Sequence, residues 1–149
     1  MKRTLFVSIF ILFSCSYSRD TVSKKLSSFL QTFSIDIKSY KVICFVPSDG
    51  CSSCIDPSIE YSKKADKRFL LVLSSLYTKS NNYIAKSRQI ELSHIVLDNQ
   101  NIACKNQLVS PTSPCFYFLN NGRIVKMVDL LQTYDKTSVL KEVDQFLSK

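Results

Sequence analysis

The sequence predicts an α/β domain: a central mixed sheet flanked by helices, with a C-terminal β-hairpin. Two apolar runs, 41–46 and 68–75, lack polar alternation, which is typical of strands buried on both faces of a helix-covered sheet. Segments of helical spacing or composition separate the strand candidates, as in parallel strand–helix–strand units. Asn121-Gly122 stands between two later apolar runs, which is a strong signal for a hairpin and an antiparallel edge.

The first predicted helix has apolar residues at spacings of three and four: Val22, Leu26, Phe29, Leu30 and Phe33. The strand at 41–46 ends in a loop at 47–50, and a helix follows in which Pro57 is tolerable only near the first turn. The remaining elements in chain order are a strand at 68–75, a helix at 78–89, a strand at 93–98, a short helix at 101–109, two hairpin strands within 115–131, and a final helix. One face of the final helix carries Val139, Leu140, Val143, Phe146 and Leu147.

The N-terminal residues have the proportions of an export signal. Lys2 and Arg3 precede an apolar run at 4–13. Such a run is too short for a permanent membrane span, which needs about 20 apolar residues. The run is followed by Ser14 and Cys15. This ending, Leu-Phe-Ser-Cys, resembles the lipobox of bacterial lipoproteins, in which the cysteine is lipidated and becomes the first mature residue.

The lipobox resemblance implies a signal peptide at residues 1–14, a lipid on Cys15, a tether at 15–21 and one domain at 22–149. The protein would then be anchored in the bacterial cell envelope, outside the cytosol and on the periplasmic side, where disulfides persist or are actively managed. An ordinary signal peptide with Cys15 incidental and an uncleaved anchor are the alternatives.

The distribution of charge argues against nucleic acid as a partner. The chain carries a formal net charge of +8, but its basic residues are scattered, with no dense basic cluster interleaved with aromatic residues. This pattern is typical of a solvated surface that suits acidic phospholipid headgroups or acidic proteins. We therefore expect a membrane and proteins as partners, and no nucleic acid.

Cys51 and Cys54 form a Cys-x-x-Cys pair shortly after the first central strand. Such a pair can be a redox couple, half of a metal site or a structural disulfide. At a helix start, two intervening residues bring the sulfurs within bonding reach. The positive end of the helix there lowers the pKa of the first thiol from about 8.5 to roughly 7. We expect Cys51 to be the nucleophile and Cys54 the resolving thiol, with Ser52 and Ser53 as possible hydroxyl donors.

Three stretches carry a resemblance to a known family: VICFVPSDGCSSC, IVLDNQNIACKNQLVSPTSP and PCFYFLNNGRIV. The first is similar to the strand, loop and Cys-x-x-Cys of the thioredoxin superfamily. The second resembles the superfamily's strand, Asp and short helix, which lead to a proline. The third resembles the superfamily's segment of proline, strand and hairpin glycine. Among the members of that superfamily, the chain most resembles the membrane-anchored, extracytoplasmic TlpA-like thiol–disulfide oxidoreductases. The resemblance covers residues 25–149 and implies a thioredoxin-like fold.

The family resemblance also implies roles for particular residues. Cys51 and Cys54 would exchange electrons with protein thiols and disulfides, a redox partner protein would resupply them, and no cofactor is implied. Pro114 matches the family's cis-proline, which would place Ser113 beside the cysteines for substrate binding. Gly50, which we also assign to substrate binding, stands where the family usually has Trp, and the chain has no Trp at all.

The other cysteines and the single histidine receive structural interpretations. Cys44 is expected to be a small buried residue within its strand, Cys115 to face the core, and Cys104, on the short helix, to be structural or incidental. A Cys104–Cys115 disulfide and a role for Cys115 as an extra redox partner stay open. His94 is expected at a surface or an edge, and no residue is assigned as a metal ligand.

Two rival functions stay open on the sequence. In the first, the same fold is a non-enzymatic lipoprotein that binds a partner, and Cys51 and Cys54 form a permanent structural disulfide. In the second, the pair belongs to a carrier of a metal such as copper, and Cys104, Cys115 or His94 would complete a tetrahedral set of ligands.

Overall fold

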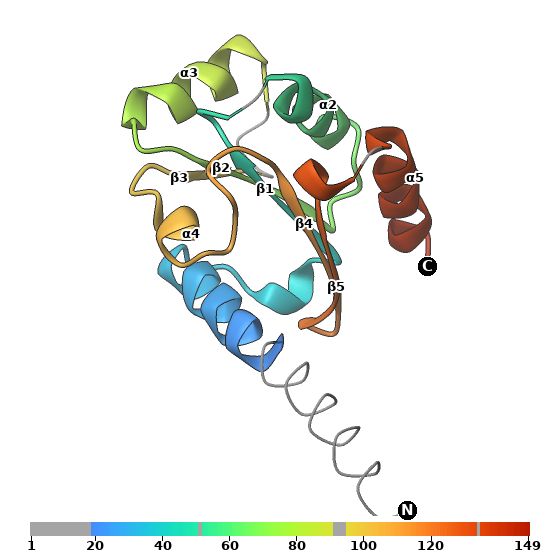
Figure 1. Cartoon of the computed structure of the whole chain (residues 1–149). Coiled ribbons are helices and arrows are strands. Elements are labelled where there is room, and N and C mark those ends of the chain that lie inside the picture. The colour runs from blue at the N-terminus through green and yellow to red at the C-terminus, as the bar shows by residue number, and fades with distance from the viewer. Residues whose placement is uncertain (1–18, 51, 91–94, 134) are drawn as a thin grey trace, which may run out of the picture.

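The computed structural model describes residues 19–50, 52–90, 95–133 and 135–149. In these ranges the chain folds into a five-stranded mixed sheet with the strand order β3-β2-β1-β4-β5, flanked by helices (Figure 1). The α/β class and the order of helices and strands predicted from the sequence are confirmed.

The strands of the sheet are β1 (Val42–Pro47), β2 (Phe69–Ser74), β3 (Ile95–Asp98), β4 (Cys115–Asn120) and β5 (Arg123–Asp129). The helices are an N-terminal helix over residues 19–32, α2 (Ser52–Ser62), α3 (Thr78–Ser87), α4 (Ile102–Lys105) and α5 (Lys136–Leu147). Two 3-10 turns are η1 (Ile37–Ser39) and η3 (Leu130–Gln132). α4 is shorter than predicted because Gln107, at φ 59, turns the chain into the left-handed region that ends helices.

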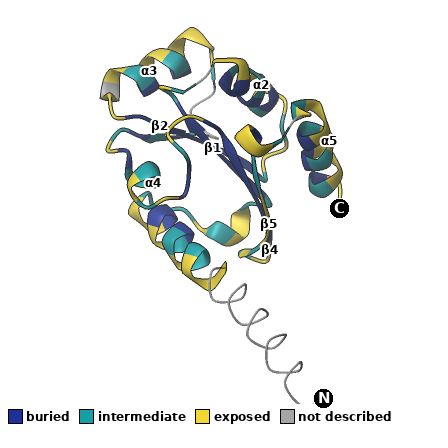
Figure 2. Ribbon diagram, viewed as in Figure 1, coloured by how far each residue is buried: buried dark blue, intermediate teal, exposed yellow. Residues whose placement is uncertain are grey.

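β1 is the central strand of the sheet. It pairs in parallel with β2 and antiparallel with β4, and all of its residues are buried. Val42, Cys44 and Val46 enter the core on one face of the sheet, whereas Ile43 and Phe45 enter the core on the other. Figure 2 shows β1 and β2 as buried strands between layers of helices. The prediction that the strand is buried on both faces is confirmed.

The helices divide between the two faces of the sheet (Figure 1). α2, α3 and α5 contribute to one core, in which the buried helical residues include Ile55, Ile59, Ala85, Val139, Val143 and Leu147. The N-terminal helix and α4 contribute to the other core through Leu26, Phe29, Leu30 and Ala103. The apolar faces predicted for the first and last helices are therefore the faces that pack on the sheet.

The β4–β5 hairpin turns where the sequence predicted it. Asn121 has φ 50 and Gly122 has φ 76, so both central residues lie in the left-handed region. This is the requirement of a type I′ turn, and it explains the Asn-Gly pair, because these residue types tolerate positive φ best.

Pro57 lies deeper in α2 than the sequence reasoning allowed. It is the sixth residue of the helix, beyond the first turn, so the expectation that a proline would sit only near the first turn is wrong. Proline has no N–H, and the carbonyl oxygen of Ser53, four residues earlier, therefore lacks its usual helical donor. The ammonium group of Lys136 donates to that oxygen at 3.0 Å.

The predicted signal peptide and Cys15, the predicted site of lipidation, lie outside the described residues. Residues 19–21, at the end of the predicted tether, are already helical and continue into the N-terminal helix. Within the described part of the chain, no helix has the length and apolar character needed to span a membrane.

Replacing Gly122 with alanine is expected to destabilise the fold by about 1–2 kcal/mol, because a Cβ atom is disfavoured at positive φ. That Cβ would also lie 3.1 Å from Cγ2 of Ile37. Urea unfolding should show a lower midpoint with an unchanged slope. Asn120→Ala, at the exposed end of β4, is the matched control and should change stability by less than about 0.5 kcal/mol. Equal stability of the two variants would contradict the turn assignment.

Candidate functional site

The carboxyl end of β1 leads directly into the Cys-x-x-Cys segment. Gly50 N–H donates to the Pro47 carbonyl at 3.0 Å, which closes a tight turn after the strand, and α2 begins at Ser52. Cys54 lies in the first turn of α2 and is buried, with 7% of its surface exposed. Cys51, the predicted nucleophile, lies outside the described residues. The segment thus joins a buried strand to a helix start, as the sequence predicted.

Gly50 lies against the backbone of a loop that comes from far along the chain. A Cβ atom on Gly50 would be 2.9 Å from the carbonyl oxygen and 3.1 Å from the carbonyl carbon of Thr112. Neither backbone atom can rotate away, so only glycine allows this approach. The structure therefore brings Gly50 next to the loop that holds Ser113 and Pro114. The absence of a side chain at position 50 therefore has a local steric reason.

The loop before β4 has a different backbone from the one expected. None of the peptide bonds that the structure describes is cis, so the expectation of a cis-proline at Pro114 is wrong. Trans is the more stable isomer of an X–Pro bond by about 0.5–1 kcal/mol. Ser113 is fully buried, and the Pro114 carbonyl accepts a hydrogen bond from Leu130 N–H at 3.0 Å. Ser113 and Pro114 are thus held near the segment that contains Gly50, with a trans peptide.

Asp49, which directly precedes Gly50, is hydrogen-bonded to the segment that follows β2. Its carboxylate accepts hydrogen bonds from Ser75 Oγ at 2.7 Å and from Leu76 N–H at 3.3 Å. Burial raises the pKa of the Cys104 thiol, and the negative charges of Asp98 and Asp49 add to that rise, whereas the hydrogen bond with Ser74 opposes it. The carboxylate therefore lies toward the end of β2.

A buried polar network fixes the neighbouring strand ends. Ser74 Oγ donates toward Asp98 Oδ2 at 2.8 Å and toward Asn101 Oδ1 at 2.9 Å. Asp98 in turn accepts the N–H groups of Ile102 and Ala103, the first residues of α4, at 2.9 and 2.8 Å. A buried carboxylate is stable when such donors satisfy it. The network holds the carboxyl ends of β2 and β3 and the start of α4 in one arrangement beside the Asp49 loop.

Two further thiols are buried in the sheet. Burial raises the pKa of the Cys44 thiol well above its usual value, and nearby Cys115 adds to the effect. Burial, with a contribution from Asp129, raises the pKa of Cys115 to about 12. Both groups are therefore protonated at neutral pH, and the expectation that Cys44 is a small buried residue and that Cys115 faces the core is confirmed.

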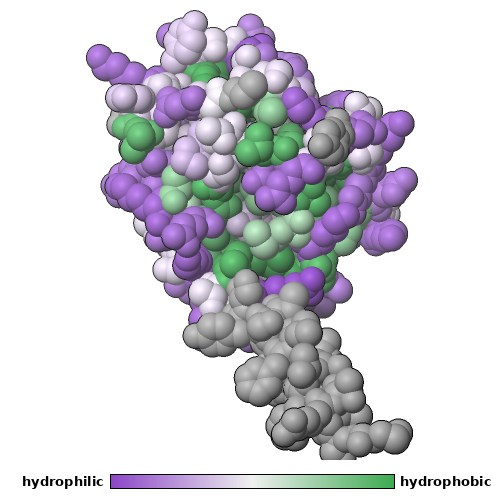
Figure 3. Space-filling view, viewed as in Figure 1, coloured by the Kyte–Doolittle hydropathy of each residue, from purple (hydrophilic) through white to green (hydrophobic). Residues whose placement is uncertain are grey.

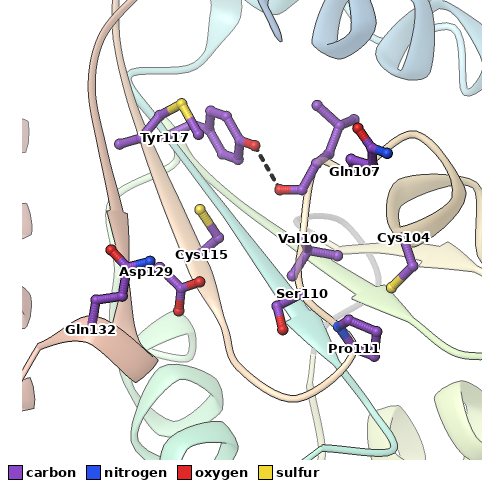
Figure 4. Close-up of a pocket in the computed structure, with 11 residues that line it drawn as sticks. Cys104, Gln107, Val109, Ser110, Pro111, Cys115, Tyr117, Asp129 and Gln132 are labelled. Carbon is purple, nitrogen blue, oxygen red and sulfur yellow. Dashed lines mark hydrogen bonds between the residues drawn. The ribbon is translucent and has the colours of Figure 1, made fainter.

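A separate pocket of about 500 Å³ lies between the 104–111 segment and strands β4 and β5 (Figure 4). Cys104 and Cys115 both line it, and both are free thiols, so the disulfide considered between them is not formed. Figure 4 shows the two side chains on opposite sides of Val109 and Ser110. The residues that line this pocket do not include Gly50 or Cys54.

Large apolar side chains are exposed on both flanks of the site. Leu76 and Tyr77 are 68% and 67% exposed, and Leu76 N–H bonds to Asp49, one residue before Gly50. Leu131, 67% exposed, follows the residue that bonds to the Pro114 carbonyl. On the face drawn in Figure 3, hydrophobic side chains lie in small groups between hydrophilic ones. Exposed apolar groups gathered on one part of a surface are typical of protein-binding sites.

The sequence reasoning missed Lys136. This first residue of α5 places its ammonium group 3.0 Å from the carbonyl oxygen and 3.5 Å from Oγ of Ser53, between the two cysteines in sequence. Pro57 was the available signal, because a proline inside a helix leaves a carbonyl that needs another donor. The identity of that donor depends on tertiary packing and could not be read from local sequence.

No metal site is evident in the ranges that the structure covers. No group of three or more His, Cys, Asp or Glu side chains there could hold an ion. Cys51 and His94, two of the metal ligands considered from the sequence, lie outside those ranges.

In comparisons with known proteins, no family model matches the chain and no curated protein sequence matches it.

Gly50→Ala is expected to separate the two loops of the site. Because the added Cβ would meet Thr112 backbone, the variant should lose about 1–3 kcal/mol of unfolding free energy, the usual cost of overpacking. Urea unfolding measures the loss. Ser52→Ala, at the start of α2, is the control and should stay within about 0.5 kcal/mol of the parent. A Gly50→Ala protein as stable as the parent would show that the backbones do not touch.

The buried thiols should resist alkylation in the folded protein. The thiolate is the reactive form, and a pKa of about 12 leaves about one Cys115 thiol in ten thousand ionised at pH 8. Iodoacetamide at pH 8 should therefore leave Cys44 and Cys115 unmodified, as read by peptide mass spectrometry. Both should react at ordinary rates in urea. Rapid labelling of either thiol without denaturant would contradict their burial.

Proposed function

We propose that the chain is a lipid-anchored, extracytoplasmic thiol–disulfide oxidoreductase with a thioredoxin-like fold. It exchanges electrons with protein thiols and disulfides through Cys51 and Cys54. The observation that carries the proposal is the contact of Gly50 with Thr112, because it sets the Cys-x-x-Cys segment beside the loop of Ser113 and Pro114.

The environment of the pair suits thiol chemistry. Cys54 is nearly buried in the first turn of α2, as a resolving thiol should be, and Cys51 immediately precedes that helix in sequence. Thiols at helix N-termini are more acidic than free cysteine, because the helix dipole favours a negative charge there. Burial raises the pKa values of the Cys44, Cys104 and Cys115 thiols, which disfavours their reactive thiolate forms.

The proposed reaction conserves atoms and charge. The Cys51 thiolate attacks one sulfur of a substrate disulfide, forms a mixed disulfide and expels the other substrate sulfur as a thiolate. Cys54 then loses its proton and attacks the Cys51 sulfur, which closes the Cys51–Cys54 disulfide and releases the second substrate thiolate. Two electrons pass to the substrate, and the two protons of the pair end on its thiols. The reverse sequence oxidises a substrate dithiol.

Protein substrates and a protein redox partner suit the surface around this pair. Leu76, Tyr77 and Leu131 offer exposed apolar area on both sides of the segment, which a peptide chain can cover. The chemistry needs no cofactor, since the electrons are held in the two sulfurs. The lipid on Cys15 would keep the domain at the membrane surface on the periplasmic side of the bacterial envelope.

A trapping experiment tests the proposal. Cys54→Ala should accumulate mixed disulfides with substrate proteins in cells, because the resolving step is removed, whereas Cys51→Ala should trap none. Non-reducing electrophoresis and mass spectrometry identify the adducts. Adding Cys104→Ala to Cys54→Ala is the matched control, and trapping should persist because Cys104 lines a different pocket.

The reduction potential gives an independent measurement. Equilibration with glutathione buffers should place the Cys51–Cys54 pair between roughly −120 and −270 mV, the range of exchanging pairs. A value below about −300 mV, together with no trapping by either variant, would replace the proposal with a structural disulfide in a partner-binding lipoprotein. Metal retained after reducing purification would instead favour the metal carrier.

A further inference from the structure

The pocket between the 104–111 segment and strands β4 and β5 lies where the helices on this face of the sheet stop short of β5. Met127 of β5 pairs with Tyr117 of β4, so the two side chains share one face of the sheet. Tyr117 is buried in the core formed with the N-terminal helix and α4, whereas Met127 is 44% exposed. The space above these strands has a volume of about 500 Å³, which is in the range of small-molecule sites.

Hydrogen bonds of the protein itself hold the pocket in shape. Tyr117 Oη donates to the Leu108 carbonyl at 2.6 Å, which ties the 104–111 segment to β4 (Figure 4). Leu108 is itself buried, so this side of the pocket is anchored in the core. Asp129 Oδ1 accepts from Leu131 N–H at 2.8 Å, which orients the carboxylate at the end of β5. The pocket is therefore formed without a ligand.

The lining of the pocket combines apolar side chains with one carboxylate. Apolar side chains line it from both sides: Val109, Pro111, Tyr117 and Met127. Among the described residues that line the pocket, Asp129 is the only one with a formally charged group. Figure 4 shows its carboxylate on the side of the strands, next to Cys115 and directed toward the 104–111 segment.

No cation in the described part of the chain neutralises Asp129. None of the ion pairs among the described residues includes it. Burial raises the pKa of the Cys104 and Cys115 thiols, so they add no charge to the pocket at neutral pH. The ammonium group of Lys25 donates to Gln107 Oε1 at 3.2 Å, and Figure 4 shows Gln107 and Asp129 on opposite sides of the pocket. The end of the pocket at Asp129 is therefore negatively charged.

We propose that this pocket binds an organic cation, an ammonium or guanidinium group on an apolar chain, with its charge on Asp129 and its chain on Tyr117 and Met127. The cation would form a charge-assisted hydrogen bond with the carboxylate, and the apolar chain would be removed from water. Asp129 would repel an anion, and a neutral apolar molecule would leave the carboxylate unpaired. Neither Gly50 nor Cys54 lines the pocket, so the site goes beyond the cysteine pair and is tested independently of it.

Isothermal titration calorimetry of the full-length protein at neutral pH tests the preference for a cation. The probes are pentylammonium chloride and 1-pentanol, which share an apolar chain and differ in charge. Pentylammonium should bind about five- to tenfold more tightly than pentanol, as expected for a hydrogen-bonded charge pair that is partly exposed. Equal affinities, or no binding of pentylammonium at concentrations up to about 10 mM, would overturn the proposal.

Asp129→Asn should remove this preference, because the amide carries no charge. The amide oxygen can still accept the Leu131 N–H, so the cap at the start of η3 is kept. Asp135→Asn is the matched control: Asp135 also caps a helix, α5, but does not line the pocket, and the preference should be unchanged. A preference that survives Asp129→Asn would overturn the proposal.

The parent protein gives a test that needs no variant, in case Asp129→Asn does not fold. Raising NaCl from about 50 to about 500 mM should weaken the binding of pentylammonium relative to that of pentanol, because salt screens a charge pair that water can reach. A ratio of the two affinities that does not change with salt would contradict a role for the carboxylate.

The position of the bound probe is read at Met127. The chain has two methionines, Met1 and Met127, so the Met127 methyl group can be followed by NMR after isotope labelling of methionine methyl groups. Met127→Leu, which removes the signal, assigns it. Saturating pentylammonium should shift this signal, and an unmoved signal would show that the probe binds elsewhere and overturn the proposal.

The cation can come from a free amine or from a lysine or arginine side chain of another protein, and two further probes distinguish these sources. A short blocked peptide with one lysine among alanines presents the side chain, and the same peptide with norleucine in place of lysine is its neutral counterpart. If the lysine peptide binds more tightly than pentylammonium, a protein is the source, and the reverse order indicates a small molecule. Equal binding of the two peptides, together with equal binding of pentylammonium and pentanol, would overturn the proposal.

Discussion

The burial of β1 on both faces is the constraint on which the rest of the structure depends. The side chains of β1 are apolar on both faces of the sheet, so neither face can be left in water. Such a strand needs a neighbouring strand on each side and a layer of helices on each face. The neighbours β2 and β4 and the two layers of helices meet these requirements. In the loop that follows Pro47 the chain approaches solvent, and the cysteine pair follows there.

The change of strand direction beside β1 brings distant segments together. β1 and β2 run in parallel, but β4 is antiparallel to β1, and Phe45 pairs with Cys115. The carboxyl end of β1 therefore lies beside the amino end of β4, and the loop that enters β4 has to pass the loop that leaves β1. The close approach of Gly50 to Thr112 follows from this topology together with the absence of a side chain. One sheet register thus fixes both halves of the candidate site.

Local patterns were sufficient to predict the elements of the fold but not all of its contacts. The buried strands, the amphipathic helices and the Asn121-Gly122 turn follow from hydrophobic spacing and from the φ angles that each residue tolerates. The trans peptide at Pro114 was not predicted, because the expectation of a cis peptide came from the family resemblance and not from the local sequence. Lys136 was missed for a different reason: its contact with Ser53 spans the chain, and no periodic pattern encodes it.

The same long-range contact makes the hydrogen bonding of the first turn of α2 depend on α5. α5 is held by buried Val139 and Val143, and by the hydrogen bond from Tyr61 Oη to Asp144 at 2.6 Å. If α5 leaves the sheet, both cysteines keep their places in the chain, but the first turn of α2 loses its cation. A partly folded chain and a folded one thus carry the same two thiols with different surroundings. Docking of α5 and the hydrogen bonding of the first turn of α2 are coupled through the ammonium group of Lys136.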